Sequence, residues 1–467
     1  MTEGFVAGGA IIAAGLALQV CVGPVVWNAL AWPVNTVVLA ALLLVIVLAH
    51  VLRDKVYICR YLSTIDAAVP ALIYTAALTL VMGLTRQKTG GGWLHDMLSF
   101  WPFVLTYLHL VVILGVTILK RIVKLRRELP FLLNHLGLFV ALVAATLGNA
   151  DLQRVKMITA PHTLEWRAFD ADMRVVEMPI AVELKRFIME TYDDGTPRRF
   201  ASDIEIVTRS GKEFPATVDV NQPVTVDGWK IYQFSYDTAL GSESQTSILE
   251  FVRDPWLPAV YAGFFMMLAG ALLLLTYTRW SYKRLLPISL LVAAALFCVS
   301  YFMPVIRSTK LVPALQSPWF TPHILVYIVC YSLMGAAAVM AIYLLIKKKS
   351  VNPPLGALQR FAYEEPFTPN PIDNLIYIGL TFMTFGMLFG AFWAKEAWGH
   401  YWSWDPKETW AAITWCSYLV YIHYRRLPTH RPRLALALVL ICFVLLQMCW
   451  WGINYLPAAQ GASIHTY

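Results

Sequence analysis

The residues best suited to bind a ligand lie in one short segment, 393–410, near the C-terminal end of the chain. An indole is large and flat, and its ring N–H usually needs a hydrogen-bond partner. A polar segment this rich in tryptophan therefore indicates a surface that holds a large, flat, apolar partner with polar edges, and haem fits that description. An interfacial belt of aromatic residues is the alternative. The five tryptophans are Trp393, Trp398, Trp402, Trp404 and Trp410.

Asp405, within this segment, has two possible roles. Pro406 follows it directly and Glu408 lies three residues further on. This order predicts a helix N-cap with proline at the first helical position and a capping box. The N-terminus of a helix is also a favourable place for an anion such as a haem propionate. The cap does not exclude the binding role, so both remain open.

Two histidines are expected beside the tryptophan segment. His323 follows Pro322 at the start of a predicted span, and proline is favoured in the first turn of a helix. His465 lies in the C-terminal tail. Both are expected on the same side of the membrane as the tryptophans, where they could meet. A stripe at helical spacing continues from His323 and is more typical of a packing face than of a cofactor site; it consists of Tyr327, Cys330, Tyr331 and Met334.

Two further histidines are expected near the opposite membrane face. His135 lies close to the start of one predicted span and His423 at the end of another. Ionisable residues inside spans are costly and are candidates for function. Two pairs of histidines at two depths suit two haem positions, each with an imidazole on either face of the iron. His109 and His50 compete with His135 for this role, and most histidines bind no metal.

The composition is that of a membrane protein. Of 467 residues, 58% are hydrophobic and only 14% are charged, and the mean hydropathy is +0.59. No soluble domain needs that much apolar surface. The net charge of +8 could suggest nucleic acid, but the charges lie in short loops between apolar runs. We therefore expect a lipid bilayer as a partner and no nucleic acid.

Eleven apolar runs are long enough to cross a bilayer as helices. Lysine and arginine are concentrated in the loops after every second run, beginning with the loop after the second. The positive-inside rule then places the N-terminus in the cytoplasm, and the C-terminus and the tryptophan segment outside. The expected fold is an all-α polytopic membrane protein with about 11 transmembrane helices. The runs are 5–22, 33–52, 65–84, 99–119, 130–148, 257–276, 287–306, 322–346, 374–393, 407–424 and 434–452.

The segment 149–256 differs from the rest because it is charged and contains turn signals and short alternating runs. We expect it to form one small β-rich extracytoplasmic domain between the fifth and sixth spans. Turns are predicted at Asp193-Asp-Gly195, Ser210-Gly211 and Asp227-Gly228, and strands at Asp203–Thr208, Pro223–Val226 and Lys230–Ser235.

The seven cysteines are not arranged for redox chemistry. None forms a Cys-x-x-Cys pair, and six of them lie in apolar runs. A disulfide framework or a thiol-redox site is therefore not expected. The cysteines are interpreted as small hydrophobic residues in helices.

The tryptophan segment resembles a known signature. From Trp398 to Trp410 it reads Trp-Gly-x-Tyr-Trp-x-Trp-Asp-Pro-Lys-Glu-Thr-Trp. This resembles the "WWD" signature of the haem-handling proteins of cytochrome c maturation, and its ending is similar to that of the Ccs-type (System II) cytochrome c synthases. Three other segments resemble the histidine-bearing segments of that family: Ser317–His323, Tyr421–Arg425, and Gly452–Asn454 with Ile464–Tyr467.

The front half resembles the B subunit of the same system, so the chain resembles a natural fusion of both subunits. The segments that carry this likeness are Phe131–Gly137, Asp219–Val224, Gly228–Gln233 and Arg253–Trp256. The resemblance implies three parts. Residues 1–129 would be N-terminal transmembrane helices, 130–276 a B-like part, and 277–467 an A-like haem-handling part with its loop at 393–410.

The resemblance implies an enzyme of the bacterial inner membrane, a holocytochrome-c synthase. Such a protein exports haem b and attaches it through thioether bonds to the Cys-x-x-Cys-His segment of apocytochrome c. His135 and His423 would ligate haem in the membrane, and His323 and His465 at the outer site. The platform that orients the ring would consist of Trp398, Gly399, Tyr401, Trp402, Trp404 and Asp405.

Other functions remain open from sequence. A haem exporter or chaperone without ligation activity would use the same tryptophan loop and outer histidines. A transmembrane electron carrier would use stacked haems and need no apocytochrome. A thiol-reducing, thioredoxin-like protein is a further candidate partner if the chain is a synthase.

Overall fold

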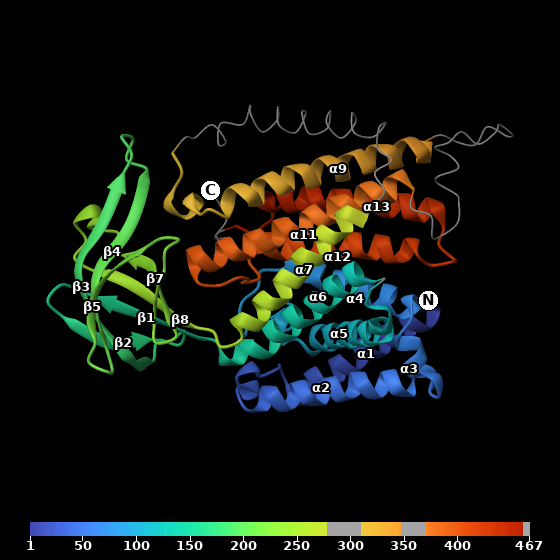
Figure 1. Ribbon diagram of the computed structural model, residues 1–467, viewed down its shortest axis with the longest axis horizontal. Coiled ribbons are helices and arrows are strands. Elements are labelled where there is room, and N and C mark those ends of the chain that lie inside the picture. Colours follow the sequence, from blue (N-terminus) through green and yellow to red (C-terminus); the bar gives the residue numbers. More distant parts are fainter. Residues whose placement is uncertain (127, 278–309, 347–369, 461–467) are drawn as a thin grey trace.

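The computed structural model describes residues 1–126, 128–277, 310–346 and 370–460. Within this part, a bundle of long helices carries a β domain at one end, as Figure 1 shows. We call the end of the bundle next to the β domain the β-domain end, and the opposite end the far end.

The helices are built from long apolar stretches. Several carry exposed hydrophobic side chains on the outside of the bundle, as expected for surfaces that face lipid. Before the β domain come α1 (Thr2–Val22), α2 (Val34–Val51), the short α3 (Tyr57–Leu62), α4 (Ile65–Leu84), α5 (Trp101–Arg121) and α6 (Leu129–Gly148). After it come α7 (Leu257–Tyr277), α9 (Phe320–Ile346), α11 (Pro371–Trp398), α12 (Pro406–Arg425) and α13 (Pro432–Trp450).

Nine of the described helices are long and apolar enough to cross a membrane. A tenth, α12, has 20 residues and packs against α4, α11 and α13. It falls short on composition because charged and polar residues occupy both of its ends. The predicted span 287–306 lies outside the described residues. By length and composition these helices are typical of an integral membrane protein, and ten of the eleven predicted spans coincide with described helices.

The long helices alternate in direction. The N-terminal amine pairs with Asp66, at the start of α4, at the far end. The ring of Trp101, at the start of α5, donates to the carbonyl of Gly23, just after α1, at the β-domain end. The chain enters the β domain from α6 and leaves it through α7 (Figure 1). The described helices therefore agree with the alternation expected from the loop charges.

The β domain is one eight-stranded antiparallel sheet in the order β5-β4-β3-β2-β1-β8-β7-β6. All three predicted turns are confirmed, with Gly195, Gly211 and Gly228 at positive φ. Two of the predicted strands fall within β4 and β7, and the third coincides with β6 except for Pro223, which lies just before it. The strands are β1 (Gln153–Thr159), β2 (Leu164–Phe169), β3 (Val175–Thr191), β4 (Pro197–Thr208), β5 (Glu213–Asp219), β6 (Val224–Val226), β7 (Trp229–Tyr236) and β8 (Ser247–Arg253).

The sheet curls around its own apolar core, so the domain is barrel-like. Alternate residues such as Val155 and Met157 in β1, and Leu249 and Phe251 in β8, point into this core and are buried. Their neighbours point outward, as the period of two requires. The outer face of β1, β7 and β8 is therefore available to contact the helix bundle.

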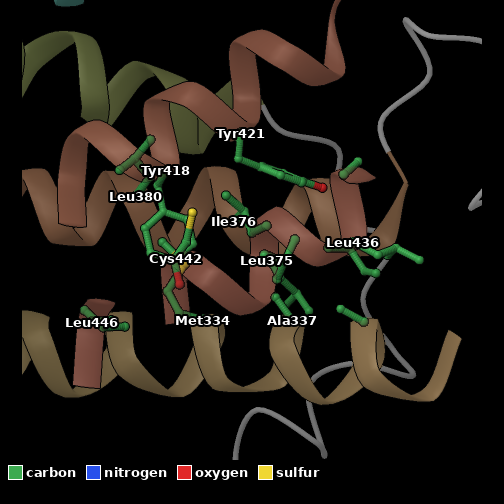
Figure 2. Packing of buried hydrophobic residues seen from close by; sticks show 14 of the residues in the cluster. Met334, Ala337, Leu375, Ile376, Leu380, Tyr418, Tyr421, Leu436, Cys442 and Leu446 are labelled. Atoms are coloured by element: carbon green, nitrogen blue, oxygen red, sulfur yellow. The ribbon is translucent and has the colours of Figure 1, made fainter. Parts of the chain in front are cut away.

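The second half of the bundle has its own core between α9, α11, α12 and α13. Figure 2 shows Met334, Ile376, Tyr418 and Cys442 packed together there. Cys330 and Cys442 are free and buried, which confirms their interpretation as small hydrophobic residues. The face of α9 that carries Cys330 and Met334 is a packing face in this region.

One carboxylate helps to hold the start of α2 against the rest of the bundle. Asp151, just after α6, accepts hydrogen bonds from the backbone N–H of Trp32 at 2.7 Å and the amide of Asn35 at 2.7 Å. The same carboxylate accepts the ring N–H of Trp256, before α7, at 2.8 Å. Charge-assisted bonds of this kind are among the stronger ones. Asp151 thereby joins the start of α2 to both helices that flank the β domain.

Candidate functional site

The tryptophan loop begins where α11 ends. Trp398 is the last helical residue, and Gly399 follows in the left-handed conformation with φ of 74°. Glycine ends helices in this way because it has no Cβ to clash. A Cβ on Gly399 would also lie within 3.2 Å of the Tyr232 ring and 3.1 Å of Val252. The loop therefore leaves the helix in direct contact with the outer face of the β domain.

Asp405 ends the loop and starts α12. Its carboxylate accepts hydrogen bonds from the backbone N–H groups of Lys407 at 2.8 Å and Glu408 at 3.1 Å. The Glu408 side chain accepts in return from the N–H of Asp405 at 3.3 Å and of Ser403 at 2.7 Å. The capping box predicted from sequence is confirmed. The cap fixes the second end of the loop, as Gly399 fixes the first.

The five tryptophans fall into two groups. Trp393 and Trp410 are only 3% and 2% exposed. Their ring N–H groups donate to the carbonyls of Ala314 at 2.7 Å and Gly83 at 3.1 Å. These two rings therefore pack in the protein interior, one against the segment before α9 and the other against α4. Sequence did not separate them from the partly exposed loop residues Trp398, Trp402 and Trp404.

The loop tryptophans also differ among themselves. The Trp402 and Trp404 rings meet edge to face, with centroids 5.7 Å apart. Trp404 packs against a small cluster that contains Met82 of α4, Phe103 of α5, and Met97 from the segment between these helices. The ring nitrogen of Trp402 is buried, and the described residues offer it no hydrogen-bond partner. A buried donor without a partner is costly, and a ligand with a polar edge would relieve that cost.

His323 lies one helix away from the loop, in the first turn of α9. Its Nδ1 lies 2.8 Å from the carbonyl oxygen of Gly386 in α11. A carbonyl only accepts, so Nδ1 carries the proton and Nε2 the lone pair that a metal needs. The His323 ring lies 5.8 Å from Trp393, which in turn lies 5.3 Å from Trp398. A continuous set of aromatic rings thus connects the imidazole to the tryptophan loop.

Two glycines of α11 make room for this arrangement. A Cβ on Gly390 would lie 2.9 Å from the His323 ring, and one on Gly386 would lie 2.5 Å from the Tyr327 ring. Gly390 is needed for the position of His323, because the imidazole occupies the space that a side chain would fill.

At the far end, the structure brings His135 of α6 and His423 of α12 together. Their ring centroids are 6.5 Å apart, and the ring planes make an angle of 67°. A metal–imidazole bond is about 2 Å long, so two rings that share one metal have centres about 6 Å apart. The pair therefore has the separation that one iron between two imidazoles requires.

Both members of this pair are held by the same kind of hydrogen bond. Nδ1 of His135 lies 2.8 Å from the carbonyl of Phe131, and Nδ1 of His423 lies 2.8 Å from the carbonyl of Leu419. Each Nδ1 therefore carries the proton, and each Nε2 carries a lone pair. Metal-binding histidines are commonly oriented through their other nitrogen in this way. Two neutral imidazoles of this kind could hold a metal ion through their Nε2 atoms.

The competing histidines are placed elsewhere. His50 lies near the end of α2, with Nδ1 3.4 Å from Arg53. His109 is half-buried in the middle of α5. His423 has His135 as its neighbouring imidazole, which favours His135 among the three candidates. His465 lies outside the described residues.

Two protein families match this chain, and together they cover the tryptophan loop and the His135–His423 pair. Residues 256–459 match the cytochrome C assembly protein family, and residues 125–250 match the ResB-like family. A cytochrome c biogenesis protein CcsA from Chlorella vulgaris is 32% identical over 269 residues, which cover 50% of this chain and 84% of that protein. The chain belongs to the CcsA family. Its ResB-like portion precedes the CcsA-like portion, so the chain is a fused, System II protein of cytochrome c maturation.

Other CcsA proteins are similar to a smaller share of this chain. The one from Nandina domestica is 34% identical over 200 residues, covering 34% of this chain and 60% of its own length. The one from Chlamydomonas reinhardtii is 35% identical over 165 residues, covering 34% of this chain and 44% of its own length. The ResB-like match ends within β8 and the cytochrome C assembly match begins just before α7, next to the contact of the β domain with the tryptophan loop.

Proposed function

We propose that this CcsA-family chain is a cytochrome c synthase. It would bind haem b between His135 and His423, pass it to an outer site at His323, His465 and the tryptophan loop, and join it to apocytochrome c. The observation that carries this proposal is the paired geometry of His135 and His423, since two oriented imidazoles at this separation suit haem iron. The maturation family to which the chain belongs supports haem as the ligand.

In the proposed reaction, haem b and two cysteine thiols are the substrates. Each thiol adds across one vinyl group, so that sulfur bonds to one vinyl carbon and the thiol hydrogen passes to the other. No atom of the synthase is consumed, and no nucleophile from this chain is needed. The chain would act by positioning: imidazoles hold the iron, and Trp398, Gly399, Tyr401, Trp402, Trp404 and Asp405 form the platform for the ring. Proximity of this kind supplies several kcal/mol.

The proposed location is the bacterial inner membrane, with the N-terminus in the cytoplasm. The β-domain end of the bundle, with the tryptophan loop and the C-terminus, would then face outward, where apocytochrome c is exported. A thioredoxin-like protein that keeps the substrate thiols reduced is a further proposed partner. We assign 1–129 to N-terminal membrane helices, 130–276 to the ResB-like part and 277–467 to the haem-handling part.

Co-expression tests the proposal. The chain is expressed with an apocytochrome c in a bacterial host that lacks all cytochrome c maturation systems, and the product is assayed for covalently bound haem. We expect covalent haem c only when the chain is present. Haem bound to the chain without covalent product would instead assign it to haem export or delivery. Haem that exchanges electrons without any effect on apocytochrome would assign it to electron transfer.

Gly390→Ala tests whether the position of the His323 ring matters for haem binding. The added methyl would lie 2.9 Å from a rigid imidazole, so the ring must move and its bond to Gly386 must be lost. Changes to groups that orient a metal ligand typically weaken binding by about 10–100-fold. We expect a loss of that order in haem at the outer site and a similar fall in haem c formation, measured by absorbance of the purified protein and by haem staining of the cytochrome.

Gly379→Ala is the matched control for this change. Its added methyl would meet the flexible end of Met334, at 2.9 Å, which can turn away. Both glycines lie in α11, so the helix-propensity effects are the same in kind. Equal losses in the two variants would show that helix packing, and not the position of His323, explains the result.

A further inference from the structure

The contact between the β domain and the tryptophan loop contains a buried lysine. Lys395, in the last turn of α11, is 2% exposed. Its ammonium donates to the carbonyl of Gly399 at 3.0 Å and lies 3.8 Å from a carboxylate oxygen of Asp254, which follows β8. A lysine is almost never fully buried unless it is paired. Its position therefore indicates a specific function for the charge.

A second cation reaches the same carbonyl from the other half of the chain. A guanidinium nitrogen of Arg154, in β1, lies 3.4 Å from the carbonyl oxygen of Gly399. Arg154 also faces Glu250 of β8 at 3.8 Å, and Glu250 is 3% exposed. The first carbonyl of the tryptophan loop is thus held by one cation from the CcsA-like part and one from the ResB-like part.

The four charges balance. Arg154 and Lys395 face Glu250 and Asp254, and Lys395 is the one member of this quartet that comes from the CcsA-like part. Burial raises the pKa of both carboxyls and so disfavours their charged forms, while the nearby cations act in the opposite direction and favour the carboxylates. We call these four residues with Gly399 the latch.

Apolar contacts surround the latch. Gly399 packs on Val252 and on the ring of Tyr232, which is 3% exposed. The left-handed glycine allows this close approach, because a side chain would collide with the sheet. The β domain consequently touches the loop at the residue that sets the direction of the chain after Trp398.

We propose that Lys395 is a positioning residue that locks the tryptophan loop against the ResB-like β domain. The lysine touches neither haem nor thiol in the proposed reaction. It acts through the carbonyl of Gly399, and so sets the direction in which Trp402 and Trp404 are presented. Resting on the proposed function, this assigns the β domain a task in the reaction: it holds the loop of the other half in its working orientation.

Hydrogen–deuterium exchange on the full-length, haem-free protein tests the latch without relying on haem. The reporter is the amide of Ser403, whose N–H is held by Glu408, in peptides that cover residues 399–405. Lys395→Met keeps the apolar stem and removes the charge. We expect exchange in these peptides to rise about tenfold, as loss of a charged hydrogen bond predicts, with no change in peptides from β3 and β4. Lys395→Arg restores a buried cation and is expected to return exchange towards the parent value.

The control is Lys185→Met, which removes a lysine paired with Glu183 and Glu205 on the exposed face of the β domain. It should leave the loop peptides unchanged. If Lys395→Met does not fold, Arg154→Met replaces it, since that side chain is one-third exposed, and a smaller rise in the same peptides is expected. Unchanged loop exchange in the folded variant, or an equal rise throughout the β domain, overturns the proposal.

The haem spectrum of the same variants separates this proposal from the proposed function. A latch that positions the loop predicts weaker outer-site haem in Lys395→Met, with haem at the His135–His423 pair retained. Faster exchange in the loop peptides of Lys395→Met, in a chain that never binds haem, would support the latch and contradict the proposed synthase function. Normal haem c formation by Lys395→Met would overturn the positioning role and leave the synthase intact.

Discussion

Replacing His423 with alanine is expected to remove haem from the far end of the bundle. The His135–His423 pair offers two lone pairs at a separation that suits one iron, and the variant leaves one. Changing only a group that orients a ligand weakens metal binding by about 10–100-fold, so loss of the ligand itself should reach at least about 100-fold. The absorbance spectrum of protein purified from haem-replete cells measures this loss, and haem c formation should fall with it.

His135→Ala should give the same spectrum as His423→Ala, because the two rings would share one iron. The matched control is His109→Ala, which removes a half-buried histidine from the middle of α5 and should leave the spectrum unchanged. A His423→Ala protein with the same haem content and spectrum as the parent would contradict the assignment. A loss on changing His109 alone would move the site to α5.

Much of the fold follows from local patterns. Ten of the eleven apolar runs coincide with helices, and each predicted turn of the β domain contains a glycine that needs positive φ, as Gly195 and Gly228 do. Sequence missed strands such as β1 and β8. These are the first and last strands of the domain, and they pair with each other along their full length. In β8 the outward-facing Glu250 and Val252 are also buried, and Val252 contacts the tryptophan loop, so polar and apolar residues do not alternate cleanly there. Sequence pattern cannot reveal a partner that only the tertiary fold brings close.

The candidate site could be predicted in outline. The capping box at Asp405 is a local signal, and sequence specified it. The division of the five tryptophans was not predictable, because it depends on Trp410 meeting Gly83, a residue 327 positions away. Lys395 was not singled out from sequence, although it is buried and faces Asp254 across the contact with the β domain. In each case the missing information is a long-range contact between halves of the chain.

The latch and the histidine pair place the ResB-like part at both ends of the CcsA-like part. His135 comes from α6 and meets α12 at the far end, while β1 and β8 meet the tryptophan loop at the β-domain end. Between them, α6 and α7 run side by side through the bundle (Figure 1). Each proposed haem position thus takes residues or support from both parts, which gives a physical reason for the two parts to act as one unit.

Replacing Arg425 with methionine is expected to give the largest loss of stability. Arg425, at the end of α12, is 5% exposed and forms two hydrogen bonds with Asp373 of α11, at 2.7 and 3.0 Å. Asp373 also accepts from Tyr421 at 2.7 Å. Removing one partner of a buried ion pair leaves a buried charge and costs about 3–5 kcal/mol. Thermal unfolding of the detergent-solubilised protein should show a markedly lower midpoint.

The double variant Arg425→Met with Asp373→Leu distinguishes the unpaired charge from lost packing. Removing both charges from a buried pair is often neutral, so the double variant should be more stable than Arg425→Met alone. Arg53→Met, which breaks an exposed pair with Asp54, should change stability by less than about 1 kcal/mol. Since His423 lies two residues before Arg425, the single variant should also weaken haem at the far end, and the double variant should regain it. A double variant that is no more stable than the single one would show that the α11–α12 contact depends on packing and not on the charge pair. The position of His423 would then be set by other contacts of α12.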